Sequence, residues 1–415
     1  MDLFTNPYII NNLSIVMGFA LISFLIAFLL TPLMGKLAIK VGAVDLPAWL
    51  RNKGERGIST RIHEYVYPKL GGLAVIIAIL VTLFINRDLV SVGKGVIVGI
   101  IIIGITGYLD DKFELNSKFQ LLGQILAASA VVASGISITS LNFLSMQMNF
   151  DLFSTIIRFA GFTYNFIFPA DILTILWIVG LINVINWVGG VDALNGSVTS
   201  VALFTLMLIN LANGNVALAG LIAIHLGAVL GVLPFNYPPG KIMYGSAGDF
   251  LNGFLLAVFA ILGSTKWTAS MIILAMPILD GLIVVYMRFK TNPHLLKSPL
   301  KILQVSDKNH LHHRLLDAGY SKKTVTLIET SMMIVVCSIA LILSNLRTDV
   351  LAFILGIAFL FVSFTLIFVL KKRGKRKNRA DEILDEIKAH DLPEEKEIVI
   401  KTVYENEKED EKYRY

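Results

Sequence analysis

Long apolar stretches separated by short polar connections dominate this sequence. A membrane-spanning helix needs about 17–25 residues, and eleven stretches reach that length, near 12–34, 70–86, 94–110, 118–135, 171–188, 197–213, 216–234, 248–264, 267–288, 325–345 and 348–370. Only 16% of the 415 residues are charged, whereas soluble domains carry about 25%. The chain is therefore predicted to be an all-α polytopic membrane protein with about eleven transmembrane helices.

The distribution of Lys and Arg predicts the orientation of these helices. With the N-terminus outside, the inner connections hold 25 basic residues and the outer connections hold five. Because basic residues accumulate in cytoplasmic loops, we expect the N-terminus outside and the C-terminus inside. The N-terminal residues lack a basic segment before the first apolar stretch, so that stretch is expected to remain as an uncleaved span.

Two regions differ in composition from the spans. Residues near 136–150 alternate polar and apolar side chains around an Asn, which predicts a small extracytoplasmic β-hairpin. The aromatic-rich residues that follow are expected at the outer interface. Residues 371–415 begin with a polybasic run and continue as a charged tail, predicted to be a partly disordered cytoplasmic segment. Residues 1–370 would then form the transmembrane domain.

Nearly all of the unusual polar clusters fall on the predicted cytoplasmic side. They comprise Asp45 with the basic loop up to Gly72, the pair Asp110 and Asp111 with Lys118, the group Asn183, Asn186 and Asp192, the segment 236–249, and the group His310, His312, His313 and Arg314. A transporter should carry ionisable groups near mid-membrane, but these are chiefly His225 and Asp280 here. A lone apolar-face histidine such as His225 is usually a hydrogen-bonded packing residue. The one-sided layout favours an enzyme that acts on a charged cytosolic substrate and a lipid.

These residue types indicate phosphate chemistry with a magnesium ion. Paired carboxylates suit Mg²⁺, which prefers oxygen ligands and shares bound water with phosphates; the alternative is that Asp110 and Asp111 only mark where a helix leaves the bilayer. Three histidines with an arginine provide switchable donors to phosphate. Zinc is the rival ligand for the histidines, but Cys337 is the only cysteine, so a cysteine-built site is excluded.

Four motifs, taken in order, resemble the polyprenyl-phosphate N-acetylhexosamine-1-phosphate transferases. YPKLGG, GYLDDKFELNSKFQLLGQ, NVINWVGGVDAL and DKNHLHHRLLDAGYS are similar to that family's Pro-x-x-Gly-Gly, Asp-Asp, Asn-x-x-Asn-x-x-Asp-Gly-x-Asp-Gly and His-x-His-His-Arg motifs. The family initiates O-antigen, teichoic-acid or capsule synthesis and includes the phospho-MurNAc-pentapeptide translocase. The resemblance covers about residues 12–370.

The resemblance implies transfer of an N-acetylhexosamine 1-phosphate from a UDP-sugar to undecaprenyl phosphate at a bacterial cytoplasmic membrane, with release of UMP. It implies Mg²⁺, with Mn²⁺ as a substitute, and catalytic roles for Asp110, Asp111, His310, His312 and His313. It also implies substrate-binding roles for Lys118, Asn183, Asn186, Asp192 and Arg314. Membrane lipids are expected partners, nucleic acid is not, and a homodimer is left open.

The sequence departs from the family motifs at two acidic positions. Gly189 stands where the first Asp of Asp-Gly-x-Asp-Gly is expected, and Ser246 and Asp249 exchange the Asp and Ser of Gly-Asp-x-Gly-Ser. Asp110 and Asp111 are therefore the expected metal ligands, with Asp249 and Ser246 as further candidates. Three readings stay open: an active transferase, a catalytically impaired paralogue that binds nucleotide sugar or polyprenyl phosphate as a scaffold, and a transporter. The sugar is not readable from the sequence.

Overall fold

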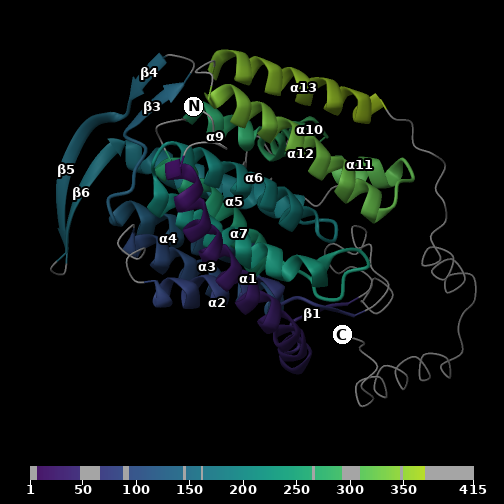
Figure 1. Cartoon of the computed structure of the whole chain (residues 1–415). Coiled ribbons are helices and arrows are strands. Elements are labelled where there is room, and N and C mark those ends of the chain that lie inside the picture. The colour runs from purple at the N-terminus through teal and green to yellow at the C-terminus, as the bar shows by residue number, and fades with distance from the viewer. Residues whose placement is uncertain are drawn as a thin grey trace, which may run out of the picture.

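The computed structural model describes residues 7–46, 66–86, 93–143, 146–159, 162–263, 267–291, 309–345 and 349–369. The tail at 371–415, predicted as a cytoplasmic segment, lies outside the described residues. Thirteen helices occupy the described part (Figure 1): α1 (Pro7–Val41), α2 (Gly71–Ile85), α3 (Lys94–Phe113), α4 (Ser117–Ala133), α5 (Ala170–Val188), α6 (Leu194–Ala212), α7 (Val216–Asn236), α8 (Gly245–Leu262), α9 (Trp267–Ile273), α10 (Ala275–Thr291), α11 (Leu311–Asp317), α12 (Lys322–Asn345) and α13 (Asp349–Val369).

Every apolar stretch predicted from the sequence is helical, with one interruption. The stretch 267–288 is divided into α9 and α10, which meet at an angle of 62°. Pro277 lies in the first turn of α10, where it has no N–H to bond to the carbonyl four residues earlier and its ring crowds that carbonyl. The proline therefore accounts for the bend.

Six of the described helices are long and apolar enough to cross a membrane, or seven if α9 and α10 form one span. Helices α2 and α4 are apolar but shorter. Backbone N–H and C=O groups in a bilayer must be satisfied internally, which long apolar helices achieve. The structure therefore describes a polytopic helical membrane protein, and the total of eleven spans with its orientation stays a prediction.

Helix α8 forms the centre of the bundle. It packs against α3 on one side and α5 on the other, and almost all of its residues are buried. Small residues allow the backbones to approach closely: a Cβ on Gly107 of α3 would collide with Ala247, and a Cβ on Gly253 of α8 would collide with the backbone of Ile182 in α5. This packing brings the ends of α3, α5 and α8 together.

The predicted hairpin near 136–150 is confirmed, and a second hairpin follows it. Strand β3 (Ser140–Phe143) pairs antiparallel with β4 (Met146–Asn149), and β5 (Asp151–Phe159) with β6 (Phe162–Pro169). The buried carboxylate of Asp171 in α5 anchors the second hairpin, because it accepts hydrogen bonds from Tyr164 Oη (2.5 Å) and the Ile167 N–H (2.8 Å). Both hairpins lie at one edge of the molecule (Figure 1).

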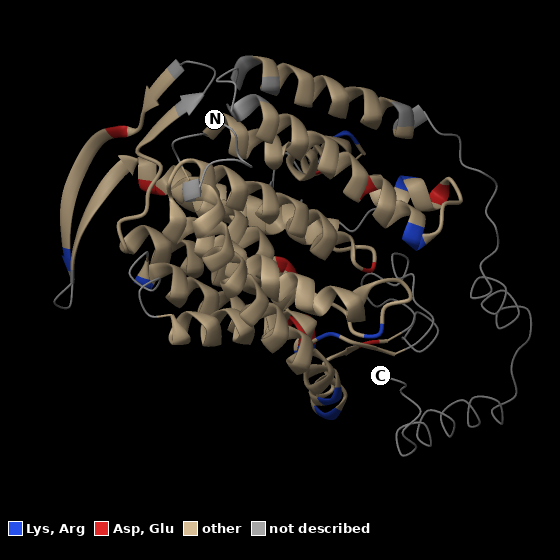
Figure 2. Ribbon diagram, in the orientation of Figure 1, with Lys and Arg blue, Asp and Glu red and all other residues tan. Residues whose placement is uncertain are grey.

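Charged residues of the described part are concentrated away from the hairpins. In Figure 2 the middle of the bundle is almost free of charge, and most Lys, Arg, Asp and Glu lie at the end opposite β3–β6. The short strands β1 (Val44–Asp45) and β2 (Tyr67–Pro68) pair antiparallel at that charged end. The polar clusters seen in the sequence therefore share one end of the structure.

Candidate active site

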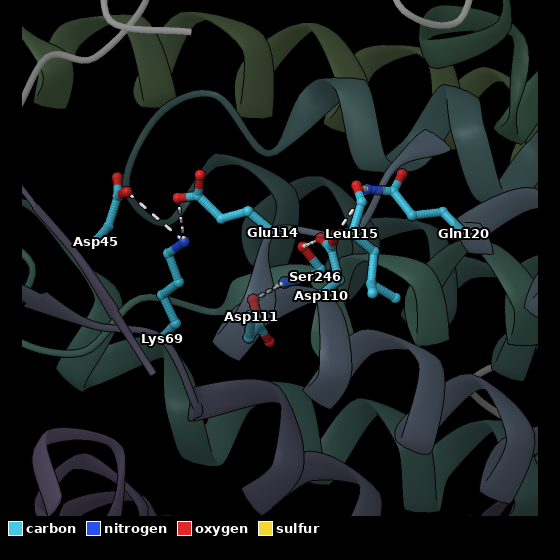
Figure 3. A network of polar contacts seen from close by, with 8 residues as sticks. All are labelled: Asp45, Lys69, Asp110, Asp111, Glu114, Leu115, Gln120 and Ser246. Carbon is cyan, nitrogen blue, oxygen red and sulfur yellow. Dashed lines mark hydrogen bonds and ion pairs between the residues drawn. The ribbon is translucent and has the colours of Figure 1, made fainter. Parts of the chain in front are cut away.

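Asp110 and Asp111 end α3 beside the first turn of α8, and each is held by specific donors (Figure 3). Asp110 accepts hydrogen bonds from Gln120 Nε2 (2.7 Å) on α4 and from Ser246 Oγ (2.5 Å) on α8. Asp111 accepts from the backbone N–H groups of Ser246 (2.7 Å) and Ala247 (3.2 Å). The two neighbouring acids therefore have different surroundings. Asp110 links α3 to side chains of α4 and α8, whereas Asp111 accepts from the first backbone N–H groups of α8 and so caps that helix.

The cap that Asp111 provides depends on a glycine. The first N–H groups of a helix have no partner within the helix, and a carboxylate there is favoured by the helix dipole. Gly245 begins α8 with a φ of 75°, and a Cβ at this position would collide with the carbonyl oxygen of Lys69 and crowd the Asp111 carboxylate. Glycine is thus required for Asp111 to reach the start of α8.

Lys69 lies on the other side of the acid pair. Its Nζ is 3.6 Å from Asp45 Oδ1 and 3.7 Å from Glu114 Oε1 (Figure 3). The segment that carries it is tied to the residues before α8, because Met243 N–H donates to Pro68 O (2.7 Å) and Gly72 N–H donates to Tyr244 O (2.7 Å). Segments about 175 residues apart in the chain therefore form one wall of the site.

A cavity of about 230 Å³ opens between these segments and the loop that joins α5 to α6. Its lining residues are Asp45, Lys69, Asp111, Gly189, Gly190, Val191, Asp192, Asn195, Asn236, Met243, Tyr244, Gly245, Ser246 and Asp249. Pockets that enclose drug-sized ligands span about 300–1,000 Å³. A cavity of this size has room for phosphate groups and a cation.

The lining is strongly acidic. It contains four carboxylates, Asp45, Asp111, Asp192 and Asp249, and among the described lining residues a single ammonium group, Lys69. Asp192 Oδ2 lies 3.6 Å from Lys322 Nζ, Asp45 is paired with Lys69, and Asp111 is held by backbone amides. Asp249 is 9% exposed, and its Oδ1 has no hydrogen-bond partner within the described part of the chain. A buried carboxylate oxygen without a donor requires a cation or a proton.

The α5–α6 loop is held in place by amide side chains. Ala193 adopts the left-handed conformation, with a φ of 62°, and its N–H donates to Asn236 Oδ1 (2.8 Å). Asn195 Nδ2 donates to Ile185 O (2.8 Å), and Asn252 Nδ2 donates to Asn195 Oδ1 (2.8 Å). His225 Nε2 lies 2.9 Å from Asn252 Oδ1, so His225 is a hydrogen-bonded packing residue as predicted.

The three histidines form a compact cluster at the start of α11. The rings of His310 and His312 are stacked, with centroids 5.5 Å apart, and those of His312 and His313 are 4.4 Å apart. Burial, together with the neighbouring His313 and His310, holds the pKa of His312 well below its usual value of 6.5. A Cβ on Gly190 would collide with His312 Nε2, so the cluster borders the cavity through this glycine.

A carboxylate on α10 orients the cluster. Asp280 Oδ2 lies 2.8 Å from His310 Nδ1, and Asp280 Oδ1 accepts a hydrogen bond from the Leu311 N–H (2.9 Å). Both side chains are buried. An acid on one ring nitrogen sets which tautomer the other nitrogen presents, so Asp280 positions His310.

The other residues predicted for the site do not line the cavity. Lys118 is exposed at the start of α4. Asn183 Nδ2 donates to Gln124 Oε1 (2.7 Å), Asn186 is half-buried, and Arg314 Nε donates to Asn309 O (3.2 Å). Of the predicted site residues, only Asp111, Asp192, Ser246 and Asp249 belong to the lining.

Sequence reasoning did not assign Lys69, Gln120 or Asp280 to the site. Lys69 is one of several basic residues in its loop, and Gln120 is a single amide in an apolar stretch. Asp280 is one of the few ionisable residues within a predicted span, which is a signal for function. None of these three residues belongs to a sequence motif whose spacing would identify its partner. Their contacts are therefore visible only in the structure.

The donor set fits Mg²⁺ that is shared with substrate phosphates. No group of three or more His, Cys, Asp or Glu residues among those described is arranged to enclose a metal ion. Mg²⁺ is usually bound through one or two carboxylates, water and substrate phosphates rather than by a complete protein cage. The unpartnered Oδ1 of Asp249, a residue that lines the same cavity as Asp111, provides such a partial site.

Comparison with known proteins finds similar bacterial transferases. Residues 94–264 match the model of glycosyl transferase family 4. A probable undecaprenyl-phosphate N-acetylglucosaminyl 1-phosphate transferase of Bacillus subtilis (strain 168) is 29% identical over 349 residues, which cover 82% of this chain and 88% of the relative. The decaprenyl-phosphate N-acetylglucosaminephosphotransferase of Mycobacterium tuberculosis (strain ATCC 25618 / H37Rv) is 28% identical over 341 residues, 73% of this chain and 76% of the relative.

A more distant relative is the phospho-N-acetylmuramoyl-pentapeptide-transferase of Streptococcus thermophilus (strain CNRZ 1066), 26% identical over 214 residues that cover 49% of this chain and 61% of the relative. The long apolar helices and these bacterial membrane transferases together assign the protein to the bacterial cytoplasmic membrane. Over residues 94–264 the chain is therefore a match to glycosyl transferase family 4, and its homologues are polyprenyl-phosphate N-acetylglucosamine-1-phosphate transferases and phospho-N-acetylmuramoyl-pentapeptide transferases.

Proposed function

We propose that the protein transfers an N-acetylhexosamine 1-phosphate from a UDP-linked amino sugar to polyprenyl phosphate and releases UMP. The observation that carries the proposal is the acidic cavity between α3, α5 and α8, bordered by a histidine cluster. An acidic cavity repels a diphosphate unless a divalent cation is present, and it is then suited to a magnesium–diphosphate complex. The relatives of Bacillus subtilis and Mycobacterium tuberculosis are named as transferases that act on undecaprenyl phosphate and decaprenyl phosphate, which supports a polyprenyl phosphate as acceptor.

The reaction needs little covalent chemistry from the protein. An oxygen of the lipid phosphate forms a bond to the β-phosphorus of the donor, and the bond from that phosphorus to the bridging oxygen breaks, so that UMP leaves with the electron pair. A phosphate monoester has a second pKa near 6, so the nucleophile is mostly dianionic at neutral pH. Catalysis therefore depends on positioning and on charge neutralisation.

Asp110 and Asp111 would have different roles in the reaction. Asp110 is held by Gln120 and Ser246 but keeps lone pairs for the lipid phosphate or its residual proton. Asp111 fixes the start of α8 and faces the cavity. Bound Mg²⁺ would supply neutralisation of the diphosphate charge, with Asp111 and Asp249 as the carboxylates in reach of it.

Lys69 and the histidine cluster would supply the groups that bind phosphate, from two different sides of the cavity. Lys69 projects into the cavity from the loop before α2 and is placed to bind a phosphate oxygen. His310, positioned by Asp280, and its neighbours His312 and His313 lie beyond Gly190, where imidazole N–H groups would donate to the diphosphate. Asn186 and Arg314 lie outside the cavity lining.

The test is release of UMP from UDP-N-acetylglucosamine by the purified protein with undecaprenyl phosphate and Mg²⁺. Turnover that requires all three components supports the proposal. UDP-N-acetylgalactosamine and UDP-MurNAc-pentapeptide, assayed in parallel, identify the sugar. No turnover with any donor, where the Bacillus subtilis relative is active in the same assay, would refute it.

A second candidate function is binding without transfer. It is favoured by Gly189 and Ser246, which replace two acids of the family motifs. A protein of this kind would bind nucleotide sugar or polyprenyl phosphate as a scaffold and would be silent in the UMP assay. Gain of turnover in the double variant Ser246→Asp with Gly189→Asp, starting from a silent parent, would support this candidate.

A further inference from the structure

The hairpin of β5 and β6 has two faces of different composition. Successive residues of a strand alternate between faces, and residues paired across an antiparallel ribbon have their side chains on the same face. Phe153 pairs with Phe168, and Ile157 pairs with Tyr164. One face, called the aromatic face, therefore carries Phe153, Thr155, Ile157, Tyr164, Phe166 and Phe168. The other, called the polar face, carries Ser154, Ile156, Arg158, Thr163, Asn165 and Ile167.

Much of the aromatic face is exposed. Phe153 is 60% exposed, Ile157 is 47% exposed and Phe168 is 45% exposed. An isolated two-stranded hairpin is marginally stable in water, and burial of its apolar side chains would stabilise it. Large apolar side chains that gather on one exposed face are typical of a surface that binds a partner or a membrane. The aromatic face is therefore a candidate docking surface.

A hydrogen bond determines the direction of the aromatic face. Tyr164, a member of this face, donates through Oη to the buried carboxylate of Asp171 in the first turn of α5 (2.5 Å). Strand β6 also packs against α5. The aromatic face is therefore turned towards the start of α5, and the polar face is turned away from it.

The helix surface beside the hairpin is suited to lipid contact. Helix α5 is long and apolar enough to cross a membrane, and its side chains Ile172 and Leu176 are 43% and 63% exposed. The hairpin lies at the end of the bundle opposite most of the charged residues (Figures 1 and 2), where the water–membrane boundary is expected. An apolar surface that faces lipid thus begins one residue after Asp171, which anchors the hairpin.

We propose that the aromatic face is a membrane-docking surface, which lies on the outer leaflet with Phe153, Ile157 and Phe168 at the boundary between headgroups and acyl chains. Amphipathic elements bind membranes in this way through their apolar face, and aromatic side chains are favoured at this depth. The polar face, with Arg158, stays in water. A lipid surface is favoured over a second copy of the chain because the aromatic face is turned towards the helix ends that a bilayer surrounds.

Spin labels on single cysteines test the docking. Cys337 is the only cysteine and is buried, so the full-length Cys337→Ala protein is a background for labels at chosen positions. Each variant is reconstituted in vesicles of phosphatidylethanolamine and phosphatidylglycerol. Electron paramagnetic resonance then compares collisions of the label with oxygen, which partitions into the bilayer, and with a nickel chelate, which stays in water.

Ile157→Cys and Ile156→Cys are a matched pair, because they are neighbours of the same residue type on opposite faces. The ratio of oxygen to nickel collisions should be about tenfold higher at position 157 than at 156, since the bilayer excludes the chelate. Phe153→Cys should behave like Ile157→Cys, and Ser154→Cys like Ile156→Cys. A period of two residues along β5 is the expected result.

A second measurement needs no label. Arg158 is the only Lys or Arg in residues 119–240, so trypsin cleavage after it reports how well the hairpin is held on the vesicle. Phe153→Asp should be cleaved about fivefold faster than the parent, because a charge opposes contact with lipid. Ser154→Asp, with the same charge on the polar face, is the control and should be cleaved at the rate of the parent.

Three results would overturn the proposal. Labels at positions 156 and 157 that both favour the nickel chelate would show that the hairpin stands in water. Spin–spin broadening at position 157 would show that a second copy covers the aromatic face, and shielding from both collision partners would show that protein covers it. Cleavage of Phe153→Asp at the rate of the parent would also contradict docking. Neither measurement depends on turnover, so the outcome is independent of the proposed function.

Discussion

Asp280 and His310, thirty residues apart, are joined by a 2.8 Å contact between Oδ2 and Nδ1. Asp280 lies in α10 just after the bend that Pro277 accounts for, and His310 precedes α11. We predict that Asp280→Asn lowers the rate of UMP release on the order of 10- to 100-fold, because a misoriented imidazole loses its alignment with the substrate.

The matched control for Asp280 is Asp317→Asn, an exposed acid at the end of α11, which should retain activity. A rate in Asp280→Asn equal to that of the parent would show that the pair is only structural.

Asp111→Ala should lower thermal stability more than Asp110→Ala. Asp111 satisfies two backbone N–H groups at the start of α8, and loss of such a cap costs about 0.5–2 kcal/mol. Asp110 accepts from side chains that can turn to other partners. The measurement is the melting temperature of each variant in detergent, with exposed Asp151→Asn as the control; equal losses would contradict a capping role for Asp111.

Lys69→Met should impair turnover more than Lys118→Met. Lys69 lines the cavity between carboxylates, whereas Lys118 is exposed and outside the lining. Loss of the ammonium group should raise KM for the UDP-sugar by about tenfold, since a charged hydrogen bond to phosphate is worth roughly 1.5–3 kcal/mol. The measurement is the steady-state kinetics of each variant. A larger effect in Lys118→Met would instead favour the substrate-binding role that the sequence predicts for Lys118.

Acid should destabilise the protein partly through His312. Burial and two neighbouring histidines keep its pKa well below 6.5 in the folded state, whereas the unfolded chain has the ordinary value. The stability from neutral His312 is complete above pH 6.5 and is lost progressively as pH falls below it, because the unfolded state then binds a proton that the folded state does not. His312→Asn should show a smaller fall of melting temperature between about pH 7 and 5; parallel curves would contradict this.

Removal of divalent cations should abolish transfer. The cavity has four carboxylates and, among its described lining residues, one ammonium group, so a diphosphate would be repelled without a cation. UMP release should cease in EDTA and return on addition of Mg²⁺ or Mn²⁺, while NaCl at equal ionic strength should not restore it. Full activity in EDTA would exclude the metal from the reaction.

The sequence by itself determined which segments are helical, because apolar runs satisfy their backbone hydrogen bonds locally and need no distant partner. It also placed the acid pair at the end of α3 and predicted the hairpin of β3 and β4, since turn chemistry and alternation act over a few residues. It did not show the second hairpin, the division of α9 from α10, or the exclusion of Lys118 from the cavity.

Only the tertiary structure decided what the polar residues do. Asp111 and Ser246 are 135 residues apart, yet they meet because α3 packs closely on α8. Asp249 fills the space beside Gly189 for a similar reason, because α5 and α8 are neighbours. Such partnerships depend on the packing of helices that are distant in the chain, and no local pattern in the sequence specifies it.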